Sequence, residues 1–262
     1  MDVRDIRDQI FAGLGARSFV AHLRAAAPGV LAGVESERRA TDLGLRLEWA
    51  WAEGDWLPAG TEIARLVGRA KALALGEECL LGCLGKASGI ATAARRAKDL
   101  AAGRVRVVSG AWKKMPPELK EMVRQAVQVG GIPSRILDEP FLYLDKNYVR
   151  MLGGIEAALA AVRGLEGVRV IQVRGEEASI AEETVRACRA GAGVVMVDTG
   201  RREDALAALE AAAPYPGVRI AFAGGIHLED IPGLADLGLH ILDIGAAIVD
   251  APLLDLQLDV VG

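Results

Sequence analysis

Two glycine-containing turns near the end of the chain have the composition of a phosphate site. Each follows an apolar run, and they are Gly224-Gly225 after residues 218–223 and Gly245-Ala246 after residues 240–244. Small residues let backbone N–H groups approach a ligand closely, and several such groups at one edge of a parallel sheet bind a dianion. The alternative is that they only allow close packing of strands on helices. Because the pairs follow successive strands, we predict phosphate binding, and we expect a valine at position 224 to block it without harming the fold.

The elements that position these turns are predicted by alternating strand-like and helix-like segments. Apolar runs separated by amphipathic helices of about ten to fifteen residues are typical of βαβ units with a buried parallel sheet. The expected strands cover residues 167–173, 193–198, 218–225 and 240–246, and the expected helices cover residues 179–190 and 202–213. Residues 101–252 are therefore predicted to form a parallel β/α barrel, an α/β architecture whose ligands bind at the carboxyl ends of the strands.

Residues 1–100 follow a different pattern, which predicts a small α+β domain. Residues 17–27 are expected to form a short amphipathic helix, and residues 70–87 a long apolar one. The hydroxyl of Ser88 is expected to cap the helix that follows. The last strand, residues 253–262, is expected to return to this first domain, and no linker separates the domain from the barrel.

The charge balance excludes several classes of partner. The chain has 31 Lys and Arg residues against 35 Asp and Glu residues, and its formal net charge of −4 gives no general attraction to nucleic acid or to an anionic membrane. No apolar run approaches the roughly twenty residues of a transmembrane helix, and the charged residues 1–5 do not resemble a signal peptide. We therefore expect a cytoplasmic protein. Cys79 and Cys83 fit reduced core residues better than a metal or redox pair, because no third ligand is near.

A series of motifs, in order along the chain, resembles the quinolinate phosphoribosyltransferase family. The motifs are PGVLAG at 28–33, EGDWLPAG at 53–60, residues 68–77, SGIAT at 88–92, AGAGVVMVD at 190–198, AGGIHLEDI at 223–231 and residues 244–255. The resemblance implies a sandwich domain, an incomplete β/α barrel and a homodimer in which the long helix of one subunit helps complete the other's site. It also implies transfer of a phosphoribosyl group from phosphoribosyl pyrophosphate to quinolinate with Mg²⁺, which releases pyrophosphate and carbon dioxide.

The resemblance assigns catalytic roles around the ribose. Such a transfer passes through an oxocarbenium-like state while negative charge grows on pyrophosphate, so Mg²⁺ and lysine or arginine must neutralise the leaving group. Asp198 matches the aspartate of the family and is predicted to hold Mg²⁺ or ribose hydroxyls, although a helix cap is the plainer interpretation of an aspartate there. Lys113 and Lys114 match the cationic segment, and with Asp198 they are the predicted catalytic residues.

The acceptor half departs from the family pattern. Lys113 replaces an arginine and loses the bidentate fork that suits a carboxylate. The other changed positions are Arg135 with Ser134 for a His-Arg pair, Asp145 and Lys146 for Lys-Asp, Glu78 for an arginine on the long helix, and Gln172 and Arg174 for two glutamates. These residues are predicted to contact substrate. Because a carboxylate among cations weakens binding of a dianion, the acceptor need not be quinolinate. A base with fewer negative charges is expected, or a cationic one that pairs with Glu78 and Asp145.

Two other classes of function stay open. The chain could be a non-catalytic binder of phosphorylated metabolites, like the ModD relatives found beside molybdate-transport genes, because a fold does not fix a function. It could also be a barrel enzyme that uses Lys113 or Lys114 as a Schiff-base or acid–base lysine on a phosphorylated metabolite. Pyrophosphate release, stabilisation by ligand without product, and borohydride trapping distinguish the three.

Overall fold

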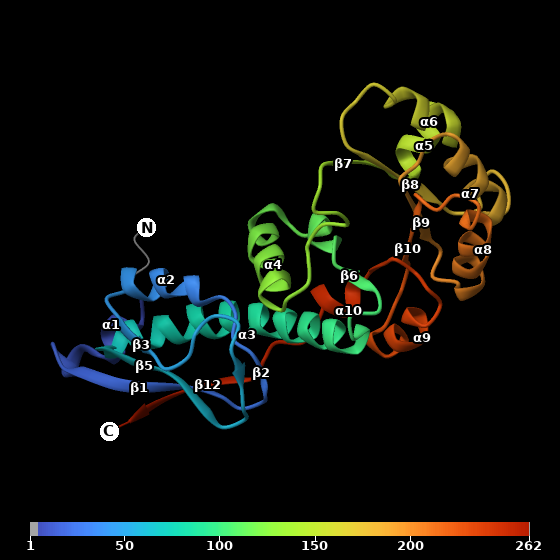
Figure 1. Ribbon diagram of the computed structural model, residues 1–262. Helices are drawn as coiled ribbons and strands as arrows, with labels where there is room; N and C mark the ends of the chain where they lie inside the picture. Colours follow the sequence, from blue (N-terminus) through green and yellow to red (C-terminus); the bar gives the residue numbers. More distant parts are fainter. Residues whose placement is uncertain (1–4, 262) are drawn as a thin grey trace. The chain divides into compact units, whose positions relative to one another are not determined.

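The computed structural model describes residues 5–261 and divides the chain into two compact units (Figure 1). The first unit contains residues up to 95, residues 117–131 and residues from 250 onward, and the second contains residues 96–116 and 132–249. The expectation about a signal peptide concerned residues 1–5, of which 1–4 lie outside the described residues, as does residue 262 at the end of the last predicted strand.

The first unit is built on a four-stranded antiparallel sheet in the order β12-β1-β5-β3. The bounds are β1 (Ser18–Ala25), β3 (Arg46–Trp49), β5 (Thr61–Arg69) and β12 (Leu256–Val261). In β1, every second residue is fully buried, at Ala21, Leu23 and Ala25. The prediction of a helix over residues 17–27 is therefore wrong. The segment has the two-residue period of a strand, and its pairing with β5 and β12 outweighs the helix preference of its alanines and leucine.

The long helix α3 (Ala70–Ala101) continues beyond the predicted end at residue 87. Ser88 lies within it and does not cap a new helix. Its buried hydroxyl accepts a hydrogen bond from the backbone N–H of Ala32 at 2.9 Å and donates one to the Ala32 carbonyl at 3.2 Å. Leu80 and Leu84 of α3 belong to the core of the first unit, together with Leu23 of β1. The serine therefore joins the helix to the loop beside it.

Shorter elements complete the first unit. They are α1 (Arg7–Ile10), the 3-10 helices η1 (Ala12–Leu14) and η2 (Val34–Ser36), α2 (Glu37–Asp42), the paired strands β2 (Gly29–Val30) and β4 (Trp56–Leu57), and α4 (Pro117–Val129). Among residues 5–261, none of the helices has the length and apolar character needed to cross a membrane.

The second unit contains six parallel strands in the order β6-β11-β10-β9-β8-β7. Their bounds are β6 (Arg106–Val108), β7 (Phe141–Leu144), β8 (Val168–Val173), β9 (Val194–Asp198), β10 (Arg219–Ala223) and β11 (Ile241–Asp243). One face of the sheet carries buried apolar side chains, among them Val170, Met196 and Ala221. The sheet has two edge strands, β6 and β7, which agrees with the predicted α/β class and incomplete barrel.

Helices follow most of these strands. They are η3 (Ala111–Lys114), α5 (Lys146–Leu152), α6 (Ile155–Ala161), α7 (Ile180–Arg189), α8 (Arg202–Ala212), η4 (Leu228–Asp230), α9 (Ile231–Ala235) and α10 (Ala246–Val249). The predictions of helices over 179–190 and 202–213 are confirmed, and α7 and α8 pack against each other. α7 begins at a capping box, in which Ser179 and Glu182 satisfy each other's backbone N–H groups.

Candidate functional site

Charged side chains lie at the carboxyl ends of β8, β9 and β11, with the uncharged end of β10 between β9 and β11. Asp198 is the last residue of β9 and Asp243 the last of β11, and both pair in register with Ala223, the last residue of β10. Arg174 directly follows β8, whose last residue pairs with Val197, so Arg174 is level with Asp198. Because strands are spaced by about 4.8 Å, the backbones of the two aspartates lie about 10 Å apart.

Asp198 is the centre of a hydrogen-bonded cluster. Its Oδ2 atom accepts hydrogen bonds from Nε2 of Gln172 at 2.5 Å and from Nη1 of Arg174 at 2.7 Å. Gln172 and Arg174 are two residues apart, so they project from the same face of the strand. Oε1 of Gln172 in turn accepts a hydrogen bond from the backbone N–H of Lys146 at 2.7 Å. The structure thus brings together four of the predicted site residues and neutralises Asp198 with Arg174.

The loop after β8 is fixed by the buried carboxylate of Glu183, on α7. One carboxylate oxygen accepts from the backbone N–H groups of Arg174 and Gly175 at 3.1 and 2.8 Å, and the other from those of Glu177 and Ala178 at 2.8 and 3.3 Å. A buried carboxylate is stable when several N–H groups satisfy it. Glu183 therefore holds the backbone that places the Arg174 guanidinium beside Asp198.

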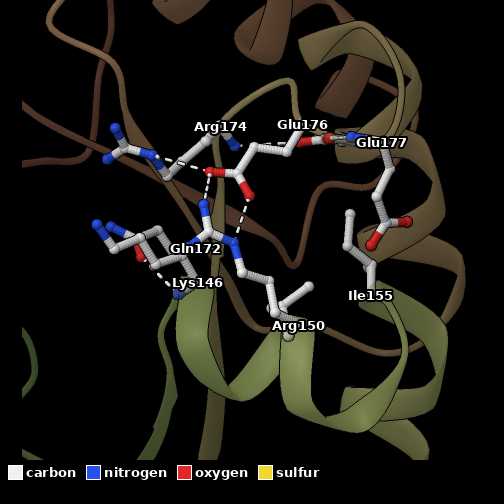
Figure 2. A pocket seen from close by; sticks show the side chains of 9 residues that line it. Lys146, Arg150, Ile155, Gln172, Arg174, Glu176 and Glu177 are labelled. Carbon is white, nitrogen blue, oxygen red and sulfur yellow. Dashed lines mark hydrogen bonds and ion pairs between the residues drawn. The ribbon is translucent and has the colours of Figure 1, made fainter.

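A pocket opens beside this cluster, between α5 and the loop after β8 (Figure 2). Glu176 points between two guanidinium groups in it. Its carboxylate accepts from Nε and Nη2 of Arg150 at 2.8 and 2.7 Å, and it lies 3.5 Å from Nε of Arg174. The hydrogen bonds from Arg150 lower the pKa of Glu176. Arg150 and Glu176 did not attract attention in the sequence, where both resemble ordinary charged residues on a helix and a loop.

Asp243 is the functional candidate that the sequence reasoning missed. Its Oδ1 atom accepts a hydrogen bond from the backbone N–H of Gly110 at 2.9 Å, and burial raises its pKa. Burial also raises the pKa of the Tyr143 hydroxyl, and the negative charges of Asp243 and Asp198 raise it further. The signal was present, because Asp243 ends an apolar strand just as Asp198 does.

The predicted lysines lie on η3, directly after β6. Both side chains are exposed, and both stabilise the ionised form of Asp243, which lowers its pKa against the effect of burial. Nζ of Lys113 lies 5.4 Å from the centre of the Tyr143 ring, within cation–π range. Lys113 and Lys114 therefore share one region with Asp243 and Tyr143.

Three other predicted substrate contacts lie in different surroundings. The exposed Arg135 lies 5.1 Å over the ring of Phe141, the first residue of β7 and thus at the other end of that strand. Asp145 caps α5 by accepting from the backbone N–H groups of Asn147 and Tyr148, at 2.8 and 3.1 Å. Glu78 lies on α3 in the first unit.

Glu78 and Asp145 were the carboxylates expected to attract a cationic acceptor. Glu78 forms an ion pair with Arg7, and Asp145 is bound to the N-terminus of its own helix. Both have partners within the chain, with which a cationic acceptor would have to compete, and the cationic acceptor stays a prediction. A role for Glu78 across a dimer stays a prediction.

The first of the two glycine turns, Gly224-Gly225, has a backbone conformation that favours glycine. Gly224 and Gly225 have φ values of 109° and 64°, a region that favours glycine. A Cβ atom on Gly224 would lie 2.5 Å from the backbone nitrogen of Gly200, whereas one on Gly225 would meet open space. The expectation that valine at 224 would spare the fold is therefore wrong. Phosphate binding at these turns and at Gly245 and Ala246 stays a prediction.

Comparison with known proteins places the chain in a family. The model of the quinolinate phosphoribosyl transferase C-terminal domain matches residues 90–259, and that of the N-terminal domain matches residues 5–88. The chain belongs to the quinolinate phosphoribosyltransferase family. A human nicotinate-nucleotide pyrophosphorylase [carboxylating] is 33% identical over 249 residues, 93% of this chain and 83% of the relative. A probable enzyme of the same name from Methanothermobacter thermautotrophicus is 30% identical over 269 residues, 98% of this chain and 94% of the relative.

Solved structures of the same family share the fold. Nicotinate-nucleotide pyrophosphorylase from Francisella tularensis has a TM-score of 0.82 at 21% identity, and the alignment covers 100% of this chain and 91% of that one. The enzyme from Ehrlichia chaffeensis has a TM-score of 0.85 at 17% identity, covering 99% and 93%. The chain therefore has the fold of this family, and its curated relatives are named as pyrophosphorylases, which are phosphoribosyltransferase enzymes.

The charged row in this family member is suited to a ligand that carries both phosphate and hydroxyl groups. Lys113 and Lys114 supply positive charge for phosphates, and the free Oδ1 edge of Asp198 can accept hydrogen bonds from hydroxyls. Within residues 5–261, no three histidine, cysteine or acidic side chains gather closely enough to hold a metal ion.

Proposed function

We propose that this chain transfers a phosphoribosyl group from phosphoribosyl pyrophosphate to the ring nitrogen of a heterocyclic acceptor. The observation that carries the proposal is the row of charged side chains at the carboxyl ends of β8, β9 and β11, with Asp198 held by Gln172 and Arg174. The family match supports the reaction class, because the curated relatives are named nicotinate-nucleotide pyrophosphorylases.

Each group has a role in the proposed reaction. The acceptor nitrogen forms a bond to the anomeric carbon of the ribose while the bond from that carbon to pyrophosphate breaks, and pyrophosphate leaves with the electron pair. Lys113 and Lys114 neutralise the charge that develops on pyrophosphate. Asp198 orients the ribose hydroxyls and stabilises the positive charge at the anomeric carbon. The turns at Gly225 and Gly245 bind the 5′-phosphate, and the donor would be bound as its Mg²⁺ complex, in which the ion would neutralise part of the pyrophosphate charge.

We propose that the acceptor carries fewer negative charges than quinolinate. Lys113 replaces a bidentate arginine, Arg174 is occupied by Asp198, and Arg135 lies over Phe141. Loss of two charge-assisted contacts at roughly 1.5–3 kcal/mol each lowers the affinity for a dicarboxylate by about two to four powers of ten. A neutral or singly charged heterocycle needs fewer of these contacts.

The proposed assembly is a two-fold homodimer. Ile6 and Ile10 of the first unit are 59% and 64% exposed, more apolar surface than an isolated helix needs. The family resemblance places the long helix α3 at the partner's site, and Glu78 would then lie near the partner's strand ends. Sedimentation at micromolar concentration tests the assembly, and a monomer would contradict it.

The reaction is tested by measuring pyrophosphate release from phosphoribosyl pyrophosphate with quinolinate, nicotinate and neutral heterocycles, with a curated relative assayed in parallel. We expect release with a neutral or monocarboxylate acceptor and turnover of quinolinate at least about 100-fold below that of the relative. Turnover of quinolinate at the rate of the relative would contradict the proposal that the acceptor carries fewer negative charges than quinolinate. Stabilisation by the donor without product with every acceptor would indicate a binder, and borohydride trapping at Lys113 or Lys114 would indicate a Schiff-base enzyme.

A further inference from the structure

The geometry of the strand ends is unsuitable for a divalent ion held by the protein. Mg²⁺ and Ca²⁺ bind oxygen ligands at about 2.0–2.6 Å, so two ligand oxygens of one ion lie no more than about 5 Å apart. Asp198 and Asp243 are separated by the whole of β10, with backbones about 10 Å apart. The two aspartates come from strands with a third strand between them, and among residues 5–261 no third histidine, cysteine or acidic side chain lies close enough to complete a metal-binding cluster.

The charges around Asp198 lead to the same conclusion. Its Oδ2 atom already accepts two hydrogen bonds, from Gln172 and from the Arg174 guanidinium. A metal ion at Oδ2 would have to displace Arg174, and one at Oδ1 of the same carboxylate would lie close to the Arg174 guanidinium, whose positive charge repels it. Lys113 and Lys114 add positive charge to the same edge of the sheet, which further lowers the affinity for a cation. The side chains present do not fit a Mg²⁺ ion bound to Asp198.

We propose that Arg174 is the resident cation of this site, in the place beside Asp198 where a divalent ion would otherwise bind, so that the free chain holds no Mg²⁺. The backbone of Arg174 is fixed by Glu183, and its Nη1 atom is 2.7 Å from Asp198. Asp198 is then the anchor of a guanidinium and a hydroxyl acceptor, and not a metal ligand. The inference goes beyond the proposed transfer and needs no substrate for its test.

The substitution Arg174→Glu tests the proposal, because it should allow the protein to bind a divalent ion. Arg174→Glu places a carboxylate level with Asp198 on the adjacent strand, with backbones about 4.8 Å apart, and the amide oxygen of Gln172 lies on the same face. Two neighbouring carboxylates and an amide oxygen are the ligands that hard divalent ions prefer. We therefore expect Arg174→Glu to create a metal site that the natural chain lacks.

The experiment titrates Mn²⁺, observed by electron paramagnetic resonance, into the free full-length protein without donor or acceptor. The natural chain is expected to bind no Mn²⁺ up to about 1 mM. Arg174→Glu is expected to bind one Mn²⁺ ion with a dissociation constant of about 100 µM or lower. Adding Asp198→Asn to Arg174→Glu should abolish the binding. Arg163→Glu is the matched control for net charge, because Arg163 is exposed and has no ion pair among residues 5–261.

Two results would overturn the proposal. The first is Mn²⁺ binding by the natural chain below about 1 mM that Asp198→Asn removes, since Asp198 would then be a metal ligand already. The second is a folded Arg174→Glu variant, verified by circular dichroism, that binds no more Mn²⁺ than Arg163→Glu. If Arg174→Glu does not fold, the comparison of the natural chain with Asp198→Asn still decides, because the proposal requires both to bind no ion. None of these results depends on whether the proposed transfer occurs.

Discussion

The two ends of the parallel sheet differ in how their charged side chains are paired. At the amino end, Arg106, the first residue of β6, pairs with Asp138 at 2.6 Å, and Arg219, the first residue of β10, pairs with Glu139 at 2.7 Å. Each arginine has one acid, and its hydrogen bond lowers the pKa of that acid. Exposed pairs of this kind contribute little to stability, and within each pair the two charges neutralise each other, whereas Arg135 at this end lies over the ring of Phe141.

At the carboxyl end, charges are not matched one to one. Arg174 lies between the carboxylates of Asp198 and Glu176, whereas Lys113 and Lys114 make no ion pair within the described part of the chain. Burial raises the pKa of Asp243 there, the opposite direction to the acids of the amino end. A perturbed carboxyl group beside lysines without ion partners is typical of a binding site, and this contrast is the physical reason to place the ligand at the carboxyl end.

The largest effect is expected when the central acid of the carboxyl end loses its charge. Asp198→Asn keeps the shape of the side chain and its acceptor oxygen but removes the nearer of the two carboxylates beside Arg174 and the negative charge proposed to stabilise the anomeric carbon. We expect pyrophosphate release with the best acceptor to fall by at least about 100-fold. The matched control is Asp138→Asn at the amino end, which should change the rate by less than about twofold. Equal losses in the two variants would remove the functional difference between the ends.

A second test removes cations from each end. We expect Lys113→Met and Lys114→Met each to weaken binding of pyrophosphate by about tenfold or more, because each loses a charge-assisted contact of about 1.5–3 kcal/mol. Arg219→Met, at the amino end, should leave the dissociation constant unchanged. Isothermal titration calorimetry of the three variants measures this. A loss of affinity in Arg219→Met as large as in the lysine variants would mean that overall charge, and not the position of the lysines, controls binding.

The third comparison lies within the carboxyl end, at the two adjacent glycines. Gly224→Val should destabilise the protein by at least about 2 kcal/mol, since its Cβ would lie 2.5 Å from the backbone nitrogen of Gly200. Gly225→Ala meets no atom and should cost about 1 kcal/mol for its positive φ. If the turn binds phosphate, Gly225→Ala should still lower the affinity for ribose 5-phosphate by several-fold. Denaturant unfolding and calorimetry separate the two effects, and unchanged affinity in Gly225→Ala would move the phosphate elsewhere.

The sequence predicted most of the second unit because its signals are local. The apolar runs of β8, β9, β10 and β11 are each bounded by turn residues, and the helices between them have clear apolar faces. The first unit was harder to predict. In β1, alanines and a leucine favour a helix locally, and only pairing with β5 and β12 reveals the strand. Ser88 has the residue type of an N-cap, yet its partner Ala32 lies 56 residues away in the chain.

The candidate site was predicted in part for the same reason. Asp198 was predicted from the family resemblance, and Asp243 shares its position at the end of an apolar strand. The pairing of Arg174 with Asp198 could not be predicted, because it depends on the register of β8 with β9. Nor could the sequence show that Asp145 caps α5 or that Glu78 pairs with Arg7. Residue types indicated charge at these positions, and only the tertiary contacts show which charges are already satisfied.

The smallest effect, and the most direct test of the contrast between the two ends, is the pH dependence of stability. The pKa of Asp243 is raised above its ordinary value of 3.8, so the folded state binds the proton more tightly than the unfolded state. Its contribution is fully present below about pH 3.8 and is lost as the pH rises through the raised pKa. Asp138 has a lowered pKa, so its contribution is present above that value and is lost as the pH falls through the lowered pKa.

The two asparagine variants should therefore diverge from the natural chain in opposite directions. As the pH rises above about 4, the free energy of unfolding of Asp243→Asn should increase relative to the natural chain, because the variant has no half-buried carboxyl group to ionise. Asn still accepts the hydrogen bond from Gly110. As the pH falls below about 4, the small deficit of Asp138→Asn should disappear, because the natural chain then loses its ion pair with Arg106. Urea unfolding at several pH values measures both differences. If the difference for Asp243→Asn stayed constant between about pH 4 and pH 8, the carboxyl end would hold an ordinary exposed aspartate, and the electrostatic contrast between the ends would rest on the lysines and Arg174 alone.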